Sequence, residues 1–428
     1  MTDIQELYQR YLHCKAVTTD TRQIIPGSIF FALKGPKFNA NTFADEALRK
    51  GASYAVVDEA AFVKGEKYIL VEDGLESLQE LARYYRSQLR IPVIGLTGSN
   101  GKTTSKELLH GVLAQKYKTY ATKGNLNNHI GVPLSVLSID STYEMAVIEM
   151  GANHVGEIAA LAKIADPTHG FITNIGKAHI GTFGSFENIV RAKSELYQHL
   201  IEQEGQVFIN SQNPILLNMA KRFKSPVFYP AAGDYYHAEL ISADPYIKFE
   251  ADNGDEVQTK LLGAYNFENI AAALCIGKFF GVEQVKANQA VAEYQPENMR
   301  SQIVRKGSNT IILDAYNANP SSMAAAIENL SAMKATKKVL ILGDMYELEG
   351  EAEKEHRNIG RLIREKGFEN VFLVGSLFKS ALPEIHKAKH FDTKQLLMEE
   401  LTMHPLQGST ILVKASRGIG LETIVEFL

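Results

Sequence analysis

The stretch Val93-Ile94-Gly95-Leu96-Thr97-Gly98-Ser99-Asn100-Gly101-Lys102-Thr103-Thr104 decides the fold of this chain. Its apolar start predicts a short buried strand, the glycines predict a turn, and we expect a helix to begin near Thr103. This geometry points backbone N–H groups and the positive end of a helix dipole at one place, where a phosphate chain can bind. Lys102 would add a mobile positive charge, and the Thr103 hydroxyl would be a ligand for Mg²⁺.

The spacing of this loop is the short form G-x-x-G-K-T-T, because Leu96 stands where the longer phosphate loop has its first glycine. A generic glycine-rich turn before a helix is the alternative interpretation. It is disfavoured because Gly-Lys-Thr-Thr follows a strand of the buried type, which is the context that a phosphate loop requires.

Length and composition indicate an ordinary globular protein with more than one domain. The chain has 428 residues, too many for one hydrophobic core, and 22% of them are charged. A net charge of −4 argues against a general nucleic-acid-binding protein. The two cysteines, Cys14 and Cys275, lack metal-ligand spacing, so we expect no zinc site or disulfide framework and a reducing, cytoplasmic location. We also expect no signal peptide and no membrane insertion.

Three segments are expected, all of the α/β class. The first, residues 1–90, is a small mixed α/β domain that ends before Ile91-Pro92, with strand candidates at residues 28–33, 52–57 and 68–71. The second, residues 91–298, alternates strands and helices, which predicts a central parallel sheet. Its strand candidates are residues 93–97, 145–150, 170–173 and 206–210, followed by short strands and turns over 226–257. The third, residues 299–428, predicts a Rossmann-like domain, with strand candidates at 310–314, 339–343, 371–374 and 410–414.

Polar residues follow two strands of the central segment, at the sheet edge where α/β proteins bind their ligands. Glu149 and His179 should therefore lie beside the phosphate loop and could complete a Mg²⁺ shell with Thr103. Imidazole is a poor ligand for Mg²⁺ in general. The interpretation of His179 as a metal ligand therefore depends on its position at a strand end. Lys193 lies on a predicted amphipathic helix, and its chemistry alone favours a solvated surface lysine.

A set of motifs that runs in order along nearly the whole chain resembles the Mur ligase family. The motifs are residues 98–104 (GSNGKTT), 124–128 (GNLNN), 149–152 (EMGA), 176–179 (GKAH), 192–193 (AK), 265–269 (YNFEN), 299–300 (MR), 314–320 (DAYNANP) and 343–345 (GDM). The resemblance implies three domains, with a phosphate-loop ATPase domain in the centre and an acceptor-binding domain at the end.

The resemblance also implies roles for individual residues in nucleotide and metal binding. Lys102 would hold the β- and γ-phosphates together with its loop, which comprises Gly98, Ser99, Asn100, Gly101, Thr103 and Thr104. Lys193 resembles a lysine that becomes carbamylated and then joins Thr103, Glu149 and His179 around Mg²⁺, and Lys102, Lys193 and His179 would be catalytic. The other nucleotide contacts would be Asn266 and Asn269 near adenine, Arg300 at a phosphate, and Asp314 and Tyr316 from the last domain.

Substrate residues follow from the same resemblance. Thr21 and Arg22 would lie in a uridine-diphosphate region, together with a turn at residues 38–43. That turn departs from the family, which often has Asp-Gly-His where this chain has Asn39-Ala40-Asn41. The remaining substrate residues would be Asn127, Asn128, Asn317, Asn319, Asp344, Lys414 and Arg417, and Glu347 is a further candidate near the acceptor.

The implied activity is that of an ATP- and Mg²⁺-dependent amide ligase, a monomer that makes a peptidoglycan precursor. It would join UDP-muramoyl tripeptide to D-alanyl-D-alanine through an acyl phosphate. A sibling that adds a single third amino acid usually carries an Asp-Asn-Pro-Arg signature, which we do not find in this chain. A folylpolyglutamate-type synthetase is disfavoured by the extra first domain. A phosphate-loop NTPase switch would leave the three-domain layout and the metal residues unexplained.

Overall fold

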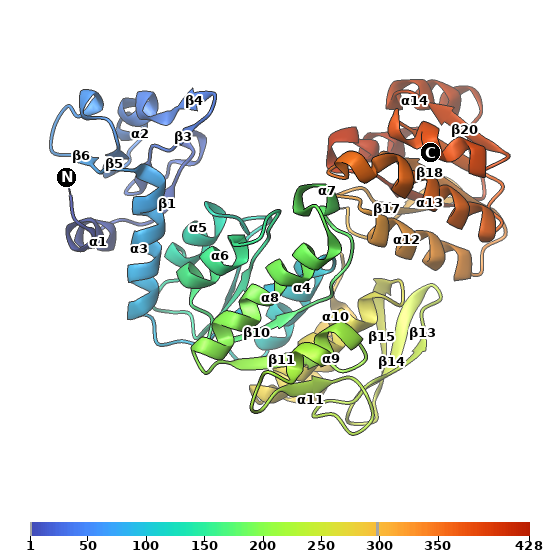
Figure 1. Ribbon diagram of the computed structural model, residues 1–428, viewed down its shortest axis with the longest axis horizontal. Helices are drawn as coiled ribbons and strands as arrows, with labels where there is room; N and C mark the ends of the chain where they lie inside the picture. The colour runs from blue at the N-terminus through green and yellow to red at the C-terminus, as the bar shows by residue number, and fades with distance from the viewer. Residues whose placement is uncertain (1, 297–298) are drawn as a thin grey trace.

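The structure is a computed structural model that describes residues 2–296 and 299–428. Three α/β lobes follow one another along the chain, and the first and last lobes lie at opposite ends of the molecule (Figure 1). Each lobe is built on a sheet that is wholly or mostly parallel, which confirms the α/β fold class. Across the described residues, no helix is both long enough and apolar enough to cross a membrane.

The first lobe has a four-stranded parallel sheet that contains the three expected strands. Its order is β1 (Val17–Thr18), β2 (Ile29–Phe31), β5 (Tyr54–Val57) and β6 (Tyr68–Leu70), and a small hairpin joins β3 (Lys34–Gly35) to β4 (Phe38–Asn39). The helices are α1 (Ile4–Leu12), α2 (Ala44–Arg49) and α3 (Gly74–Gln88), with short 3-10 turns η1 (Thr21–Gln23), η2 (Ala40–Phe43) and η3 (Ala60–Phe62).

Helix α3 connects the first lobe to the second (Figure 1). It packs on α1 on one side and on two helices of the central lobe, α5 (Gly131–Leu137) and α6 (Glu157–Ala165), on the other. The buried Arg86 guanidinium donates to the carbonyl oxygens of Ala165, at 2.9 Å, and Asp166, at 2.8 Å. These bonds satisfy the carbonyls at the C-terminal end of α6 and fix the junction.

The central lobe has a six-stranded parallel sheet. Its order is β12 (Val227–Tyr229), β11 (Gln206–Asn210), β10 (His169–Ile172), β7 (Val93–Thr97), β9 (Met145–Glu149) and β8 (Thr119–Ala121). All four strands expected in the central segment are present, and β8 is an additional edge strand. The expected helix after the glycine-rich turn is α4 (Lys102–Leu113), one residue earlier than predicted.

Alternate residues of the central strands enter two different cores, as the two-residue period of a strand requires. Ile94 and Leu96 pack with α4 and α10 (Asn266–Phe279) on one face, whereas Val93 packs with α5 and α6 on the other. The remaining helices are α7 (Ile180–Phe183), α8 (Phe186–Glu202), α9 (Pro214–Ala220) and α11 (Gln284–Glu293). An antiparallel sheet of β13 (Glu239–Ser242), β14 (Tyr246–Glu250) and β15 (Glu256–Leu262) is attached to this lobe.

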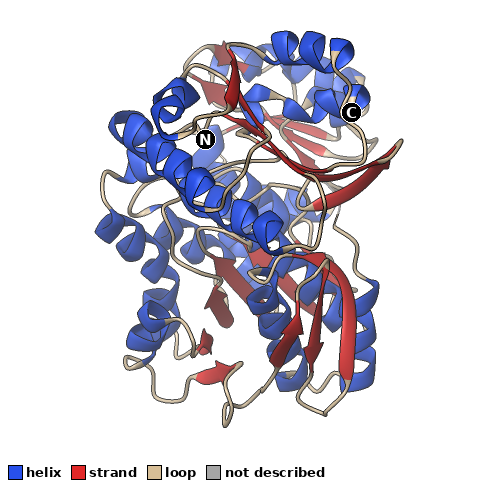
Figure 2. Ribbon diagram, turned by 90° about the vertical axis from the view of Figure 1, so that its right-hand side faces the viewer, coloured by secondary structure: helices blue, strands red, loops and turns tan. Residues whose placement is uncertain are grey.

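The last lobe has a six-stranded sheet with helices on both faces (Figure 2). Its order is β16 (Gln302–Lys306), β17 (Asn309–Asp314), β21 (Thr410–Lys414), β18 (Lys338–Gly343), β19 (Val371–Val374) and β20 (Ala388–Phe391), and β16 alone is antiparallel to its neighbour. The four expected strands are present. The helical elements are α12 (Pro320–Ala332), α13 (Ala352–Glu365), α14 (Lys394–Met403), η4 (Glu349–Glu351), η5 (Leu377–Glu384), η6 (Arg417–Ile419) and η7 (Leu421–Phe427).

Candidate active site

The glycine-rich loop leads from β7 into α4, and two of its glycines cannot be replaced without strain. Gly98 and Gly101 have φ angles of 151° and 78°, in the region that disfavours side chains. A Cβ atom at Gly98 would lie 1.9 Å from the Thr173 hydroxyl oxygen, and one at Gly101 would lie 2.6 Å from Oδ1 of Asn269. The backbone therefore comes close to its neighbours at both positions.

The loop is held in place by the segment that follows β10. The Ser99 hydroxyl donates to the Gly176 carbonyl at 2.8 Å, and the backbone N–H of Asn100 donates to Oδ1 of Asn174 at 3.0 Å. The Thr173 hydroxyl donates to the Asn100 carbonyl at 2.6 Å. No side chain caps the start of α4, so its first N–H groups remain available to an anion.

Lys102 is the cation of the loop. Its ammonium group donates to the carbonyl oxygens of Gly98, at 2.6 Å, and Ser99, at 3.3 Å. Desolvation lowers the pKa of Lys102, and the nearby Glu149 carboxylate opposes that shift. A polyphosphate is the kind of group that would compensate this charge.

Glu149, at the end of β9, is a buried carboxylate beside the loop. The Thr103 hydroxyl donates to its Oε2 at 3.1 Å, and the Asn127 amide donates to its Oε1 at 2.7 Å. The structure thus brings together two of the expected metal ligands, a hydroxyl and a carboxylate, which are the hard oxygen donors that Mg²⁺ prefers.

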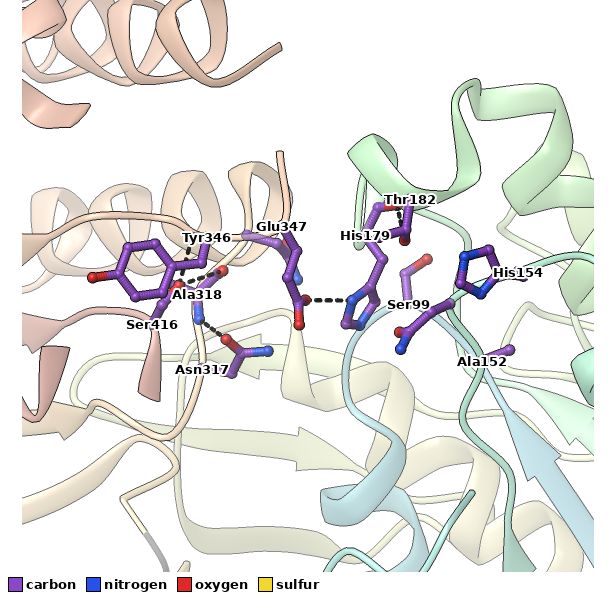
Figure 3. A network of polar contacts seen from close by, with 12 residues as sticks. Ser99, Ala152, His154, His179, Thr182, Asn317, Ala318, Tyr346, Glu347 and Ser416 are labelled. Atoms are coloured by element: carbon purple, nitrogen blue, oxygen red, sulfur yellow. Dashed lines mark hydrogen bonds and ion pairs between the residues drawn. The ribbon is translucent and has the colours of Figure 1, made fainter. Parts of the chain in front are cut away.

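His179 lies on a left-handed turn before α7 and faces the last lobe. Its Nδ1 lies 2.5 Å from Oε2 of Glu347, so the two side chains form an ion pair when the imidazole is protonated (Figure 3). The angles between the two groups do not fit a hydrogen bond. The imidazole holds the pKa of the Glu347 carboxyl below its usual range. His179 and Glu149 both line the cavity described below, and His179 is paired with Glu347 in this structure. Within the described part of the chain, no three histidine, cysteine or acidic side chains converge on a metal position.

Lys193 on α8 is buried, so the surface position favoured by its chemistry alone is wrong. Its ammonium group donates to the Ala152 carbonyl at 3.4 Å and lies 5.4 Å from the centre of the Phe183 ring. Burial, together with the charge of Lys102, lowers the pKa of Lys193 to about 7. A large fraction of this lysine is therefore a neutral amine at neutral pH, and a neutral amine is a nucleophile.

Two asparagines at the start of α10 form a chain of hydrogen bonds beneath the loop. The Ser105 hydroxyl donates to Oδ1 of Asn269 at 2.9 Å, and the Asn269 amide donates to Oδ1 of Asn266 at 2.8 Å. The Asn266 amide then donates to the Leu262 carbonyl at 2.8 Å. This chain fixes α10 against α4.

The last lobe contributes charged and aromatic groups. The Arg300 guanidinium carbon lies 3.9 Å from the centre of the Tyr316 ring, and Nε of Arg300 has no hydrogen-bond partner. The buried Lys414 ammonium lies 2.6 Å from Oδ2 of Asp314 and donates to the Asn317 carbonyl at 3.2 Å.

Direct contacts hold the last lobe against the loop. The Asn319 amide donates to Oδ1 of Asn100 at 2.8 Å. The Lys177 backbone N–H donates to the Ser321 hydroxyl at 3.0 Å, and the Lys177 ammonium lies 2.8 Å from Oε1 of Glu355. These contacts come from both lobes, so the phosphate loop and the last lobe form one site.

A cavity of about 700 Å³ lies at this junction. It is lined by most of the predicted site residues; those that do not line it are Gly98, Lys193, Thr21, Arg22, Asp344, Glu347, Arg417 and the turn at residues 38–43. It is also lined by residues that we did not predict, among them Ser321, Gln79 and His129. The Asn-Pro start of α12 was the available signal for Ser321, since a helix that begins there presents its first turn to the loop.

Asp344 requires a correction. Its buried carboxylate accepts from the backbone N–H groups of Leu377, at 3.1 Å, and Phe378, at 2.9 Å, at the start of η5. It therefore holds a loop and does not line the cavity, contrary to the expectation that it contacts the acceptor. Arg417 is exposed and donates to the Met299 sulfur at 3.5 Å, also outside the cavity lining.

The substrate residues predicted in the first lobe do not line this cavity. Arg22 is exposed and pairs with Asp20 at 2.8 Å. Asn41, where the family often has histidine, is buried; its amide donates to Oδ1 of Asp58 at 2.7 Å and its Oδ1 accepts from the Asp58 N–H at 3.1 Å. Asn41 therefore stabilises the turn from inside, and its polar atoms are already paired.

Comparisons with known proteins agree with this architecture. Residues 96–277 match the family described as Mur ligase middle domain, and residues 299–417 match Mur ligase, glutamate ligase domain. The chain is 36% identical over 423 residues to UDP-N-acetylmuramoyl-tripeptide--D-alanyl-D-alanine ligase of Bacillus subtilis, covering 96% of this chain and 92% of the relative. It superimposes on crystal structure I of MurF from Acinetobacter baumannii with a TM-score of 0.88 and 32% identity, covering 99% and 97% of the two chains. MurF ligase from Thermotoga maritima, in complex with ADP, gives a TM-score of 0.85 at 28% identity, with 100% and 98% covered.

Proposed function

This chain belongs to the Mur ligase family, and we propose that it joins D-alanyl-D-alanine to UDP-N-acetylmuramoyl tripeptide in an ATP-dependent reaction. The observation that carries the proposal is the shared cavity, which the phosphate loop lines from the central lobe and Arg300, Asp314 and Asn319 line from the last lobe. A ligase needs this arrangement, because ATP, a carboxylate and an amine must meet at one place. The relatives that match over the full length carry the name of this activity.

In this proposal the loop and Lys102 bind the β- and γ-phosphates, and Arg300 reaches a phosphate from the last lobe. The orphaned Nε of Arg300 supports that role, because a buried donor without a partner suits an anionic ligand. Asn266 and Asn269 lie on the adenine side, and Asp314 and Tyr316 approach the nucleotide from the last lobe.

Thr103 and Glu149 fit Mg²⁺, since their buried oxygens lie together beside the loop. When bound, Mg²⁺ would offset charge on the transferring phosphoryl group. We propose that Lys193, as a neutral amine, adds to CO₂ and loses a proton to become a carbamate, which gives the site a second anionic group. His179 would join these ligands only after leaving Glu347.

The reaction has two steps. The terminal carboxylate of the tripeptide attacks the γ-phosphorus, which forms an acyl phosphate and releases ADP. The amine of D-alanyl-D-alanine then attacks the acyl carbon, phosphate leaves as the amide forms, and the proton released by the nitrogen passes to the departing phosphate or to solvent. Lys102 offsets charge on the phosphoryl group, and the contacts between the lobes keep water out while the acyl phosphate exists.

The substrates would be distributed over three domains, residues 1–90, 91–298 and 299–428. Thr21 and Arg22 would contact the uridine diphosphate, and Asn127 and Asn128 the peptide. Asn317, Asn319, Lys414 and Arg417 would bind the dipeptide, and Arg417 would have to turn towards the cavity to do so. We propose that the enzyme acts as a monomer in the cytoplasm.

The test is a product assay by mass spectrometry with ATP, UDP-N-acetylmuramoyl tripeptide and D-alanyl-D-alanine. The proposal expects the donor to gain one dipeptide, with one ADP and one phosphate formed per product. Omitting either the tripeptide or the dipeptide should abolish product. Rapid ATP hydrolysis that needs neither acceptor would indicate a nucleotide switch and contradict the proposal.

A further inference from the structure

Lys106 lies one turn after Lys102 on α4 and is buried, with only 3% of its surface exposed. Its ammonium group is 3.9 Å from Oε2 of Glu149 and donates to the Gly124 carbonyl at 3.4 Å. It does not line the central cavity, and instead lines a second cavity of about 660 Å³. Lys106 therefore approaches the Glu149 carboxylate from outside the central cavity.

A buried ammonium group is costly unless a carboxylate accompanies it. Two carboxylates lie within 4.0 Å of Lys106, those of Glu149 and Glu107. Glu107 is partly exposed and accepts a hydrogen bond from the Tyr294 hydroxyl at 2.6 Å. Of the two carboxylates, Glu149 is the buried one and the one that lines the central cavity. Lys106 can therefore affect the site through its ion pair with Glu149.

Three elements meet at Lys106. It is part of α4, it bonds the loop that carries Asn127, and it faces the end of β9 where Glu149 lies. Thr103 and Asn127, the two residues that donate hydrogen bonds to Glu149, belong to the first and second of these elements. One side chain thus fixes the relative positions of the carboxylate and both of its donors.

We propose that Lys106 is a positioning residue that holds Glu149 in the orientation that a divalent cation beside Thr103 requires. The inference rests on the proposed function, because Glu149 is a metal ligand only there. Groups that orient a metal ligand typically change metal affinity about 10–100-fold when they are removed. Lys106 should therefore affect the binding of metal-nucleotide and leave the binding of free nucleotide unchanged.

The experiment measures ADP affinity of the full chain by calorimetry, with Mn²⁺ and separately with EDTA. For Lys106→Met we expect the ratio of the ADP affinity in Mn²⁺ to the ADP affinity in EDTA to fall about 10–100-fold. The ADP affinity in EDTA should stay within about twofold of the wild-type value. Lys116→Met is the matched control, because Lys116 lies just beyond α4 and is exposed. Its ammonium group donates to the backbone carbonyls of Phe280 and Gly281 and lies 5.0 Å from the centre of the Tyr117 ring. It should leave both affinities unchanged.

A double-mutant cycle with Glu149→Gln separates positioning from a general loss of structure. If Lys106 acts through Glu149, the double variant should bind Mn²⁺·ADP no more weakly than Glu149→Gln alone. Additive losses, or an equal loss in EDTA, would overturn the inference. If Lys106→Met does not fold, Lys106→Gln replaces it in the same cycle. A normal Mn²⁺ response in Glu149→Gln would refute the proposed metal site itself, whereas a normal response in Lys106→Met alone would refute only the role of Lys106.

Discussion

Two buried carboxylates occupy the same position in different sheets but have different partners. Glu149 ends β9 of the central sheet, and Asp344 directly follows β18 of the last sheet. Asp344 accepts from two backbone N–H groups, whereas Glu149 accepts from the side chains of Thr103 and Asn127. Side-chain donors can rotate away when a ligand arrives, but backbone donors cannot. The carboxyl end of β9 therefore faces the cavity, whereas the carboxyl end of β18 holds a loop.

The largest effect on ligation should come from removing the positive charge of Lys102, which lines the cavity. Lys102→Ala should reduce ligation by about 10³-fold, because charge on the transferring phosphoryl group loses its partner. The unfolding temperature should not fall, since the Lys102 ammonium bonds only loop carbonyls. Lys102→Arg should also fail, because a planar guanidinium does not replace a compact charge. A folded Lys102→Ala variant with near-normal turnover would rule out the phosphate-loop assignment.

The next effect concerns Lys193, a buried lysine whose ammonium group contacts the Ala152 carbonyl and the Phe183 ring. Lys193→Ala should lower activity by about 100-fold, as expected for loss of a group that supports a metal. Acetate or another small carboxylic acid should restore part of the activity by occupying the place of the carbamate. Lys193→Arg, assayed in parallel, should not respond to the acid. Normal turnover of Lys193→Ala without additives would mean that the lysine has no catalytic role.

A pair of isosteric changes tests the comparison directly through stability. Asp344→Asn should lower the free energy of unfolding by about 1–3 kcal/mol, because an amide nitrogen would face a backbone N–H. Glu149→Gln, made in a Lys106→Met background so that no buried ammonium group loses its carboxylate, should cost less, since the Thr103 hydroxyl can reverse and accept from the new amide. Urea denaturation measures both values. If Asp344→Asn kept full stability and instead raised the KM for the dipeptide, Asp344 would be an acceptor-binding residue after all.

The smallest effect is a pH dependence from Lys193. Burial lowers its pKa from 10.5 to about 7, so between these values the unfolded chain holds a proton that the folded chain has released. Raising the pH through this window therefore stabilises the folded state. In carbon-dioxide-free buffer, the difference in unfolding free energy between the wild type and Lys193→Met should rise by about 1 kcal/mol from pH 7.5 to 8.5. A difference that stays flat, or falls, would mean that Lys193 titrates at its ordinary pKa.

Strands inside the three main sheets could be predicted from the sequence, whereas several edge strands could not; the edge strand β6, expected at residues 68–71, is an exception. The central strands β7 and β11 have the predicted bounds, because a continuous apolar run marks a strand covered on both sides. The unpredicted strands β8, β16 and β20 all lie at sheet edges. β16 and β20 carry lysine, arginine or histidine within the strand, so they lack the apolar run.

Site residues could be predicted from the sequence where they belong to a motif with one main function. They could not be predicted where the hydrogen-bond partners in the folded chain determine whether the side chain is available to a ligand. The glycines of the loop and Lys102 belong to a motif whose spacing has one main use. Asp344 and Asn41 look equally available in the sequence, yet their polar atoms are paired with Leu377 and Phe378 in one case and Asp58 in the other. These pairings depend on loops distant in sequence, which no local pattern reveals.

Acceptor choice tests the central claim most directly. The dipeptide places its carboxylate one residue further from the reacting amine than a single amino acid does. A site built for that distance should leave its anchoring group unpaired with a shorter acceptor. With ATP and the UDP-N-acetylmuramoyl tripeptide, we predict that kcat/KM for D-alanyl-D-alanine exceeds that for D-alanine or any diamino acid by at least about 100-fold. An equal or greater kcat/KM for a single amino acid would contradict the proposed activity and favour a ligase that adds one residue.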